Sequence, residues 1–509
     1  MKRKSLFTIH YSLFTLPFSL VTLLLLAGCH SPQVPDSFSD AGEAADIYPD
    51  YAGVTVPVNM APLHFQLMQQ ADEVVARFTA GSEQLVCEGP KVRPDVADWQ
   101  TLVAGAGADG TIGVELFALS GGKWLRYNPF SIYVSPDSID PWLSYRIISP
   151  SYVTYEDLTI RQRCLESYEE RIIYDNMLCS TEKDGQCINC HNYQLGNPRR
   201  MQFHARQNLG GTVVSYDGRT VKTNLKTDST LSAGVYPAWH PRLPLIAYST
   251  NNTMQVFHTR DVNKIEVLDA ASDLILYDLD RGEVSTIEND PDEFEVFPCW
   301  SPDGKWLYYS SAHFALNDSV EAEAQVIKGY RDIKYSVYRK AFDEKTLTFG
   351  PCEMVFDAAA QGRSATVPRL SPDGCWLLLS VGEWGCFHIW HHDADLWLMD
   401  LQGDSIRAFD EVNSPSTEAW HNWSRSGRWI VFSSRRYDGD FTRPFFAHVD
   451  KDGRATKPFE LPQDDPDYHR QLMRSYNLPE LMLGPVEITP QQFADVLKQD
   501  AVPAKFVRR

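Results

Sequence analysis

The chain has 509 residues, of which 43% are hydrophobic and 22% are charged, and this is the composition of a folded globular protein. Lysine and arginine total 47 against 67 acidic residues, which gives a net charge of −20. Because so acidic a surface repels phosphates, nucleic acid is excluded as a partner. Aromatic residues make up 12% of the chain, which favours twisted sheets over helical bundles.

Residues 1–28 are typical of a signal peptide. Basic residues precede an apolar stretch that is densest from Phe14 to Leu26, and Leu-Ala-Gly then leads into Cys29. This ending resembles the bacterial lipobox and implies that Cys29 carries acyl chains that hold an exported protein to a membrane. A plain signal peptide or an N-terminal membrane anchor is the alternative. Neither residue 30 nor residue 31 is the aspartate that marks inner-membrane retention, so we expect the outer membrane, on its periplasmic or its surface side.

The next residues predict a tether and a small domain. Residues 29–50 are small, polar and contain proline, as in a flexible tether. Residues 51–150 carry short strand-like runs separated by glycine, proline and aspartate, which predicts a β-sandwich-like domain.

Residues 151–209 predict a helical linker. Leu158, Leu165 and Ile172 recur near helical spacing, and charged residues lie between them, so we expect an amphipathic helix over 156–178. The helix leads into a loop that holds a cluster of cysteines.

One phrase recurs four times in residues 210–509. An apolar or aromatic strand end is followed by a turn resembling Ser-Pro-Asp-Gly and then by an apolar strand. In the turn, proline fixes φ, aspartate caps the backbone and glycine takes the positive φ. This pattern predicts a β-propeller of about six blades with a C-terminal extension. The copies lie at 237–249, 298–311, 368–380 and 421–434.

These copies resemble the PD40 or WD40-like repeat of TolB-type β-propellers, over about half of the chain. The resemblance implies a mainly β fold and leaves the function open, since propellers host many functions. Some related propellers carry a peptidase domain after the blades. Here few residues follow the last copy, and the sequence has no Gly-x-Ser-x-Gly motif.

Residues 187–191 read Cys-Ile-Asn-Cys-His, which is the C-x-x-C-H pattern of covalent c-type haem. Cys187 and Cys190 would form thioethers with the haem vinyl groups, and His191 would be the proximal iron ligand. The motif lies between a lipobox and TolB-like blades. That order is similar to a group of envelope lipoproteins described as TolB-like or cytochrome c-type, and it implies one haem c.

Met201 and His204 are the candidate distal ligands of that iron, and packing or surface roles are the alternative for each. Two other interpretations of the cysteine pair stay open. The thiols form a structural disulfide in an oxidising compartment, or a zinc ion recruits Cys179 and His204.

Three histidines and two aspartates gather in residues 388–395. They are metal-ligand types, but the segment lies between two blade strands. We expect a solvated rim loop whose polar groups lock the blades, and we expect a structural role for His421 as well.

Two functions follow from these patterns. The first is a lipid-anchored envelope protein that carries one covalent haem on a propeller and transfers electrons to a redox or envelope protein partner. The second is a propeller without haem that acts as a protein- or glycan-binding scaffold, with Cys187 and Cys190 as a disulfide. No residue set organises a substrate site, so whether the chain is an enzyme stays open.

Overall fold

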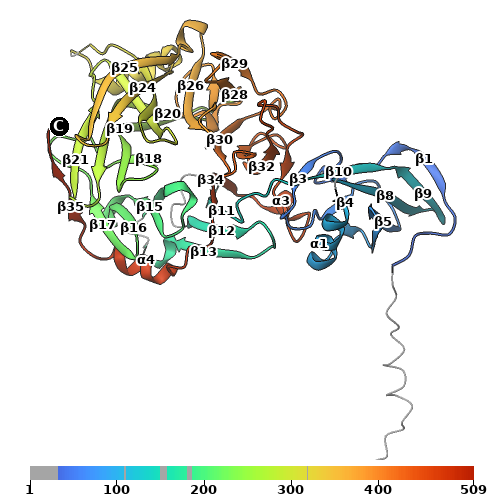
Figure 1. Cartoon of the computed structure of the whole chain (residues 1–509). Coiled ribbons are helices and arrows are strands. Elements are labelled where there is room, and N and C mark those ends of the chain that lie inside the picture. Colours follow the sequence, from blue (N-terminus) through green and yellow to red (C-terminus); the bar gives the residue numbers. More distant parts are fainter. Residues whose placement is uncertain (1–31, 108–109, 150–156, 180–185, 318) are drawn as a thin grey trace, which may run out of the picture.

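The computed structural model describes residues 32–107, 110–149, 157–179, 186–317 and 319–509. The predicted signal peptide and the predicted lipidation at Cys29 lie outside these ranges. Among the helices of the described ranges, none is both long enough and apolar enough to cross a membrane. The described chain forms a small N-terminal domain beside a ring of β-sheets (Figure 1).

The N-terminal domain contains two sheets and one helix. The larger sheet contains β1 (Ser39–Ala44), β3 (Thr55–Pro57), β5 (Glu73–Ala80), β6 (Glu83–Glu88), β8 (Thr111–Ser120), β9 (Lys123–Asn128) and β10 (Phe130–Ser135). The smaller contains β2 (Ile47–Tyr48), β4 (Phe65–Leu67) and β7 (Lys91–Val92). Helix α1 (Val96–Gly105) begins at Asp95, whose side chain accepts from the Ala97 backbone.

The structure corrects the predicted tether. β1 and β2 lie within residues 29–50, and β1 runs parallel to β9 at the edge of the larger sheet. Small polar residues do not prevent strand formation where a neighbouring strand offers free backbone groups, since backbone pairing does not depend on side chains.

The predicted helix over 156–178 is wrong. Its described part forms β12 (Thr159–Cys164) and β13 (Glu170–Asp175), an antiparallel pair, followed by a 3₁₀ turn over Asn176–Leu178. Leu158 and Leu165 are buried, but Ile172 is 38% exposed, so the three do not share one buried face. Strand β11 (Trp142–Ile148) offers an edge that β12 covers, and this tertiary pairing outweighs the helical spacing.

The rest of the chain is a six-bladed β-propeller. Each blade is a four-stranded antiparallel sheet, and its strands are named in order from the axis outward. Blade 1 contains β34 (Ser475–Met482), β11, β12 and β13; blade 2 contains β14 (Ile188–Tyr193), β15 (Arg200–Ala205), β16 (Gly211–Tyr216) and β17 (Arg219–Asn224); blade 3 contains β18 (Val235–Trp239), β19 (Leu245–Phe257), β20 (Ile265–Asp278) and β21 (Glu283–Glu288). Blade 4 contains β22 (Glu293–Trp300), β23 (Trp306–His313), β24 (Ser336–Asp343) and β25 (Thr348–Phe356); blade 5 contains β26 (Ser364–Leu370), β27 (Trp376–Gly382), β28 (Asp395–Asp400) and β29 (Ser405–Ala408); blade 6 contains β30 (Glu418–Trp423), β31 (Trp429–Ser434), β32 (Arg443–His448) and β33 (Phe459–Glu460).

The propeller therefore begins at β11 and not at residue 210. The predicted helical linker of residues 151–209 supplies the two outer strands of blade 1, β12 and β13, and the two inner strands of blade 2, β14 and β15, instead. Short helices α2 (Ala322–Gly329) and α3 (Tyr468–Gln471) lie in connections of blades 4 and 6.

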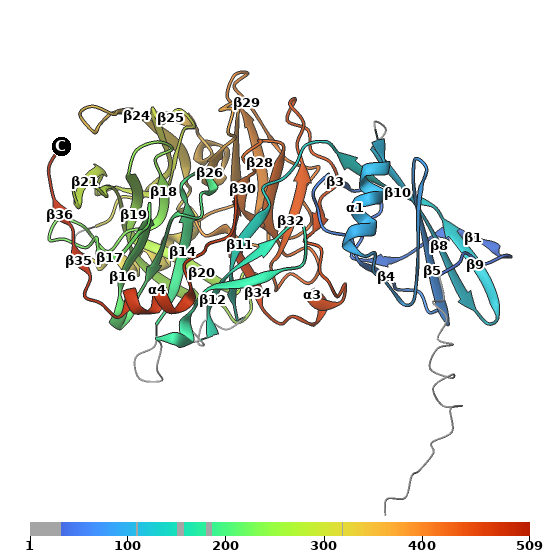
Figure 2. The same cartoon turned by 60° about the horizontal axis from the view of Figure 1, so that its bottom comes forward.

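The C-terminal part of the chain closes the ring. β34 is the inner strand of blade 1, where it pairs with β11. After it, α4 (Pro490–Leu497) packs against β13, β16 and β17, β35 (Val502–Pro503) pairs with β17, and β36 (Lys505–Phe506) pairs with β21. Figure 2 shows this last segment running along the outside of the first three blades. The predicted C-terminal extension is thus a clasp that joins blades 1, 2 and 3.

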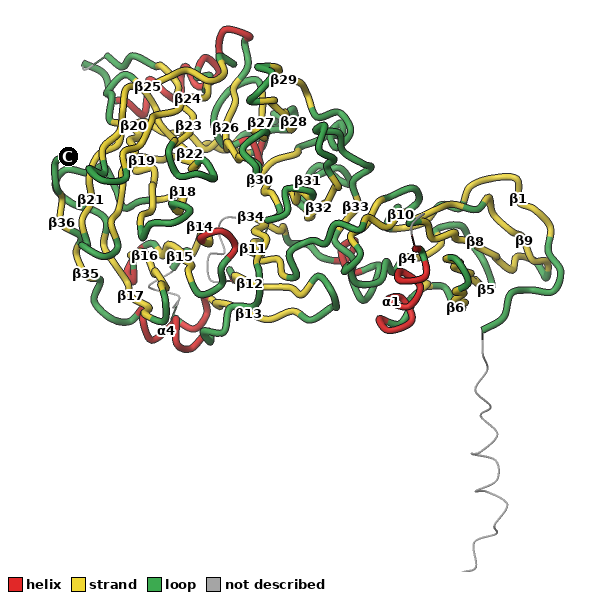
Figure 3. Tube along the Cα trace, in the orientation of Figure 1, coloured by secondary structure: helices red, strands yellow, loops and turns green. Residues whose placement is uncertain are grey.

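Each of the six inner strands carries a bulge at a residue with positive φ. Their φ values lie between 48° and 55°, although none of the six is glycine. The six are Leu478, Cys190, Tyr236, Phe297, Val367 and Trp420, in order from blade 1 to blade 6. A left-handed residue at a bulge changes the direction of the neighbouring side chains and bends the strand. The six strands therefore bend in the same way around one axis. Figure 3 shows β14, β18, β22, β30 and β34 around that axis.

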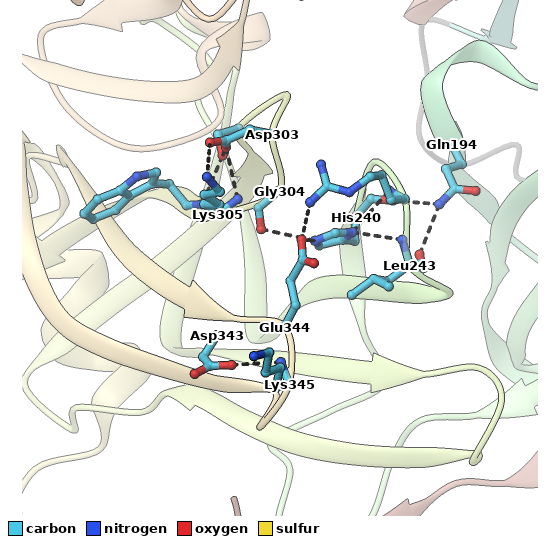
Figure 4. Close-up of polar contacts among 12 residues, drawn as sticks. Gln194, His240, Leu243, Asp303, Gly304, Lys305, Asp343, Glu344 and Lys345 are labelled. Atoms are coloured by element: carbon cyan, nitrogen blue, oxygen red, sulfur yellow. Dashed lines mark hydrogen bonds and ion pairs between the residues drawn. The ribbon is translucent and has the colours of Figure 1, made fainter.

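The repeated turns have the geometry that the sequence predicts. In blade 4, the Ser301 hydroxyl donates to Asp303 at 2.6 Å, and Gly304 takes a φ of +70°. The turns also join neighbouring blades (Figure 4). His240 accepts at Nδ1 from the Leu243 backbone at 3.0 Å, so its Nε2–H donates to the Gly304 carbonyl at 3.1 Å. Burial lowers the pKa of His240 to about 4, and the neutral ring is the form that makes both bonds.

The N-terminal domain and blade 6 share one apolar core. Trp429 and Val431 of β31 pack in the same cluster as Val54 and Phe78 of the domain. The Trp429 indole donates to the Asp137 carbonyl at 2.9 Å, which fixes the end of the domain against the blade. The domain therefore packs directly against blade 6 of the propeller.

We expect Gly304→Ala to weaken the contact between blades 3 and 4. An added Cβ would lie 2.5 Å from Nε2 of His240, so the ring or the turn must shift. Gly282→Ala is the matched control, because Gly282 has a φ of +64° and open space around it. The control should lose about 1 kcal/mol of unfolding free energy, and Gly304→Ala about 1–3 kcal/mol more. Urea unfolding measures both, and equal losses would contradict the role of His240.

Candidate functional site

The C-x-x-C-H motif lies at the start of β14, the inner strand of blade 2, with Cys187 directly before the strand, and not in a helical loop. Cys190 is the left-handed residue of that strand, and His191 follows it. The same position in blade 6 reads Trp-His-Asn-Trp over 420–423, so His191 is the structural equivalent of His421. Part of the haem motif is therefore also the repeat pattern of a propeller inner strand.

His191 and His421 occupy equivalent surroundings. The His421 ring contacts the Leu378 carbonyl of the preceding blade at 3.0 Å. The His191 ring lies near the backbone of Ser144 and Leu478 in its own preceding blade, but neither ring nitrogen is within hydrogen-bond geometry of a described atom. Burial lowers the pKa of each imidazole to about 3. Both rings act as neutral packing groups between blades.

A porphyrin does not fit beside His191 in this arrangement. The histidine is 1% exposed, and the cavity that it lines with Cys190 has a volume of about 20 Å³. That volume holds about one water molecule. Cys190 is also buried, and both Cys187 and Cys190 are free thiols, so the structure shows neither a haem pocket nor the alternative disulfide.

Met201 and His204, the predicted distal ligands, lie on β15 next to β14. Met201 is fully buried in the apolar core of blades 1 and 2, and His204 Nδ1 lies 3.3 Å from the Thr212 hydroxyl. Neither residue lines the cavity beside His191. The structure does not bring the two candidates into one site with the motif.

The second histidine cluster also has partners within the fold. His391 Nε2 contacts Glu266 at 2.9 Å, and His388 Nδ1 lies 3.1 Å from both the Thr366 hydroxyl and the Ser380 carbonyl. Within the described ranges, no group of three ligand-type side chains is arranged to hold a metal ion. These contacts agree with the expected blade-locking role, but the loop is not solvated as expected, because His388 and His391 are 2% and 1% exposed.

A cavity with a volume of about 450 Å³ lies on the propeller axis, between the inner strands of all six blades, and we call it the funnel. It opens at the end of the inner strands where the repeated turns lie. Prolines, tryptophans and leucines line its wall together with polar residues, among them Asp140 and Arg425. At its narrow end the aromatic rings of Tyr236, Phe297 and Trp420 close the axis. An apolar cluster that includes these three residues continues behind them, so the funnel is blind.

One residue from each blade forms the floor of the funnel. Each lies two positions after the left-handed residue of its inner strand, and we call the six the floor ring. Its members are Glu480, Asn192, Ala238, Cys299, Arg369 and Asn422, in order from blade 1 to blade 6. Polar groups fill one side of the ring, and the small side chains Ala238 and Cys299 fill the other.

Glu480 is the central polar group of the floor ring. One carboxylate oxygen accepts from the Asn192 amide at 3.1 Å, and the other accepts from Asn422. Burial raises the pKa of Glu480 above its ordinary value of 4.5, while the charge of Arg369 and the two amide bonds act in the opposite direction. Among the described residues, no lysine, arginine or histidine nitrogen lies within 4.0 Å of this carboxylate.

Arg369 lies on the far side of Asn422 in the floor ring. Its Nη1 donates to the Pro368 carbonyl at 3.1 Å, and the half-buried guanidinium lines the funnel. Burial raises the pKa of the neighbouring Cys299 thiol, so this floor residue is neutral. The floor therefore offers one carboxylate and one guanidinium, and a cavity of this size and lining is typical of a ligand site.

The floor ring was not predicted from the sequence, although a signal for it was present. In the recurring phrase, four floor residues directly precede the aromatic or leucine residue that ends the strand: Ala238, Cys299, Arg369 and Asn422. Alignment of the copies at that position would have collected them. Glu480 and Asn192 lie outside the four copies, in strands that the sequence did not identify as blades.

Comparisons with known proteins identify no family for the chain. No family model matches the chain, and no curated protein matches it. Prolyl oligopeptidase B from Galerina marginata is similar in structure, with a TM-score of 0.33 and 10% identity over 70% of this chain and 51% of that chain. This chain thus matches about half the length of that enzyme.

Two further structures are similar at the same level. The β-propeller domain of the trilobed protease from Pyrococcus furiosus has a TM-score of 0.33 and 11% identity, over 70% of this chain and 95% of that chain. Oligogalacturonate lyase in complex with manganese has a TM-score of 0.29 and 12% identity, over 83% and 97%. The chain is a β-propeller protein by its own six blades and closed ring.

We expect Glu480→Gln to reduce the pH dependence of folding stability. The native carboxyl holds its proton to a higher pH than the unfolded one, so the native state binds more protons between the two pKa values. Stability from this group is therefore present at low pH and is lost as pH rises through that window. Urea unfolding from pH 4 to pH 8 measures this slope. A Glu480→Gln slope as steep as that of the wild type would contradict the raised pKa.

Proposed function

We propose that this chain is an exported, TolB-like propeller that is held to the outer membrane by acyl chains on Cys29 and binds a partner molecule in its axial funnel. The observation that supports binding is the funnel itself, about 450 Å³ in volume and open at one end. Its floor places a carboxylate and a guanidinium next to small apolar side chains, and such convergent polar groups fix the orientation of a ligand.

Electron transfer through haem has weaker support. The C-x-x-C-H spacing is its only basis, and the buried His191 and the small cavity beside it do not fit a porphyrin. His191 also has a structural equivalent in His421, which accounts for a histidine at this position without an iron ion. We therefore place the function in the funnel, and haem c at Cys187 and Cys190 stays a prediction from the motif.

Crosslinking tests the funnel. A photoreactive phenylalanine analogue at Leu195, which is 51% exposed and lines the funnel, should form adducts with the ligand in intact cells. The same analogue at Ile172, which is 38% exposed on the outer strand of blade 1, is the matched control. Mass spectrometry of the adducts should find them at position 195 alone, and equal labelling at both positions would reject the funnel as the binding site.

The intact mass of the mature protein tests both covalent predictions. Made in a host that matures cytochromes c and lipoproteins, the chain should start at Cys29 and carry acyl chains. A covalent haem would add its own mass and would be lost in a Cys190→Ala variant. We expect the acyl mass without the haem mass, because the cavity at His191 is too small. A haem-bearing protein would show that blade 2 has a different arrangement from the one described.

A further inference from the structure

The charged groups lie on one side of the floor ring, and their positions indicate which kind of ligand the funnel binds. Glu480 is buried, and its two hydrogen-bond donors, Asn192 and Asn422, are neutral amides. A buried carboxylate without a cation in contact is costly unless a partner supplies the charge. A carboxylate has about four acceptor positions, and two are used, so the others are free for a donor in the funnel.

Arg369 offers the complementary group. A guanidinium has five N–H donors, and within the chain Arg369 donates from Nη1 to the Pro368 carbonyl and interacts with the Cys299 thiol. The remaining donors fit a carbonyl or another neutral acceptor. Since Asn422 alone separates Arg369 from Glu480 in the floor ring, one small ligand group can reach both.

We infer that the funnel binds the free amino end of a polypeptide, with the α-ammonium on Glu480 and the first carbonyl oxygen on Arg369. The first residue of a peptide is a group in which a cationic donor and a neutral acceptor are close neighbours. Ala238 and Cys299 leave space for a small side chain on the other side of the floor. This inference rests on the proposed function and specifies the ligand of the same site.

Charge and wall composition favour this ligand over others. A carboxyl terminus or an acidic sugar would meet both Glu480 and a protein of net charge −20. A neutral sugar has no cation for Glu480. The wall behind the first residue contains Pro237, Pro302 and Pro372 with Leu370, which are apolar surfaces suited to the side chains that follow in a peptide.

The test compares two probes on the full mature chain. Calorimetry or ligand-detected NMR should show that trialanine with a free amino end binds at least tenfold more tightly than N-acetyl-trialanine. The two probes differ only at the group that Glu480 would hold. Equal affinity, stronger binding of the acetylated probe, or no binding of either would overturn the inference. Binding of a neutral trisaccharide but not of trialanine would replace the peptide with a glycan.

Variants locate the binding. Glu480→Gln should weaken free trialanine at least tenfold and remove the preference over the acetylated probe, and Arg369→Gln should weaken both probes. Glu353→Gln is the control and should change the affinity for neither probe. Glu353 lies on β25, the outer strand of blade 4, in an exposed ion pair with Arg339. If Glu480→Gln fails to fold, the preference of the wild type for free over acetylated trialanine and the affinities of Arg369→Gln still test the inference. Adducts at position 195 without a peptide preference would leave the funnel as a binding site and reject only this ligand.

Discussion

Closure of the ring by β34 is the constraint on which the other features depend. Six twisted sheets around an axis leave two open edges unless the last segment of the chain pairs with the first. Here β34 supplies the inner strand of blade 1, and α4, β35 and β36 continue along the outside of blades 1 to 3. This pairing places Glu480 next to Asn192, 288 residues earlier in the sequence.

The same closure sets the electrostatics of the funnel. Each inner strand bends at a left-handed residue and turns the position two residues later toward the axis. β34 bends in the same way as the other inner strands, so Glu480 is buried among neutral amides. Burial of a carboxylate with no cation in contact costs stability, and the two amide bonds and the charge of Arg369 offset part of that cost. A fold tolerates such a group where a ligand meets it, which is why the floor ring and not the haem motif carries the proposed function.

The cysteine pair shows how one short pattern can have two meanings. Spacing alone makes residues 187–191 a haem motif, and the export signal is consistent with that interpretation. In the fold, Cys190 and His191 hold the same places as Trp420 and His421, and the imidazole of each is buried against the preceding blade. The packing requirement of an inner strand is therefore a sufficient reason for a histidine at this position.

The sequence by itself determined the propeller, its turn chemistry and the two inner strands of blades 3 to 6, because proline, aspartate and glycine act locally on the backbone and the apolar runs repeat. It failed for blade 1, where strand pairing with β11 overrode the helical spacing of Leu158, Leu165 and Ile172, and for blade 2, whose strands lie outside the four copies of the repeated pattern. Only the tertiary structure decided the floor ring. Glu480, Arg369 and Asn422 come from separate blades, and no local pattern records that a closed ring turns the same position of every inner strand toward one axis.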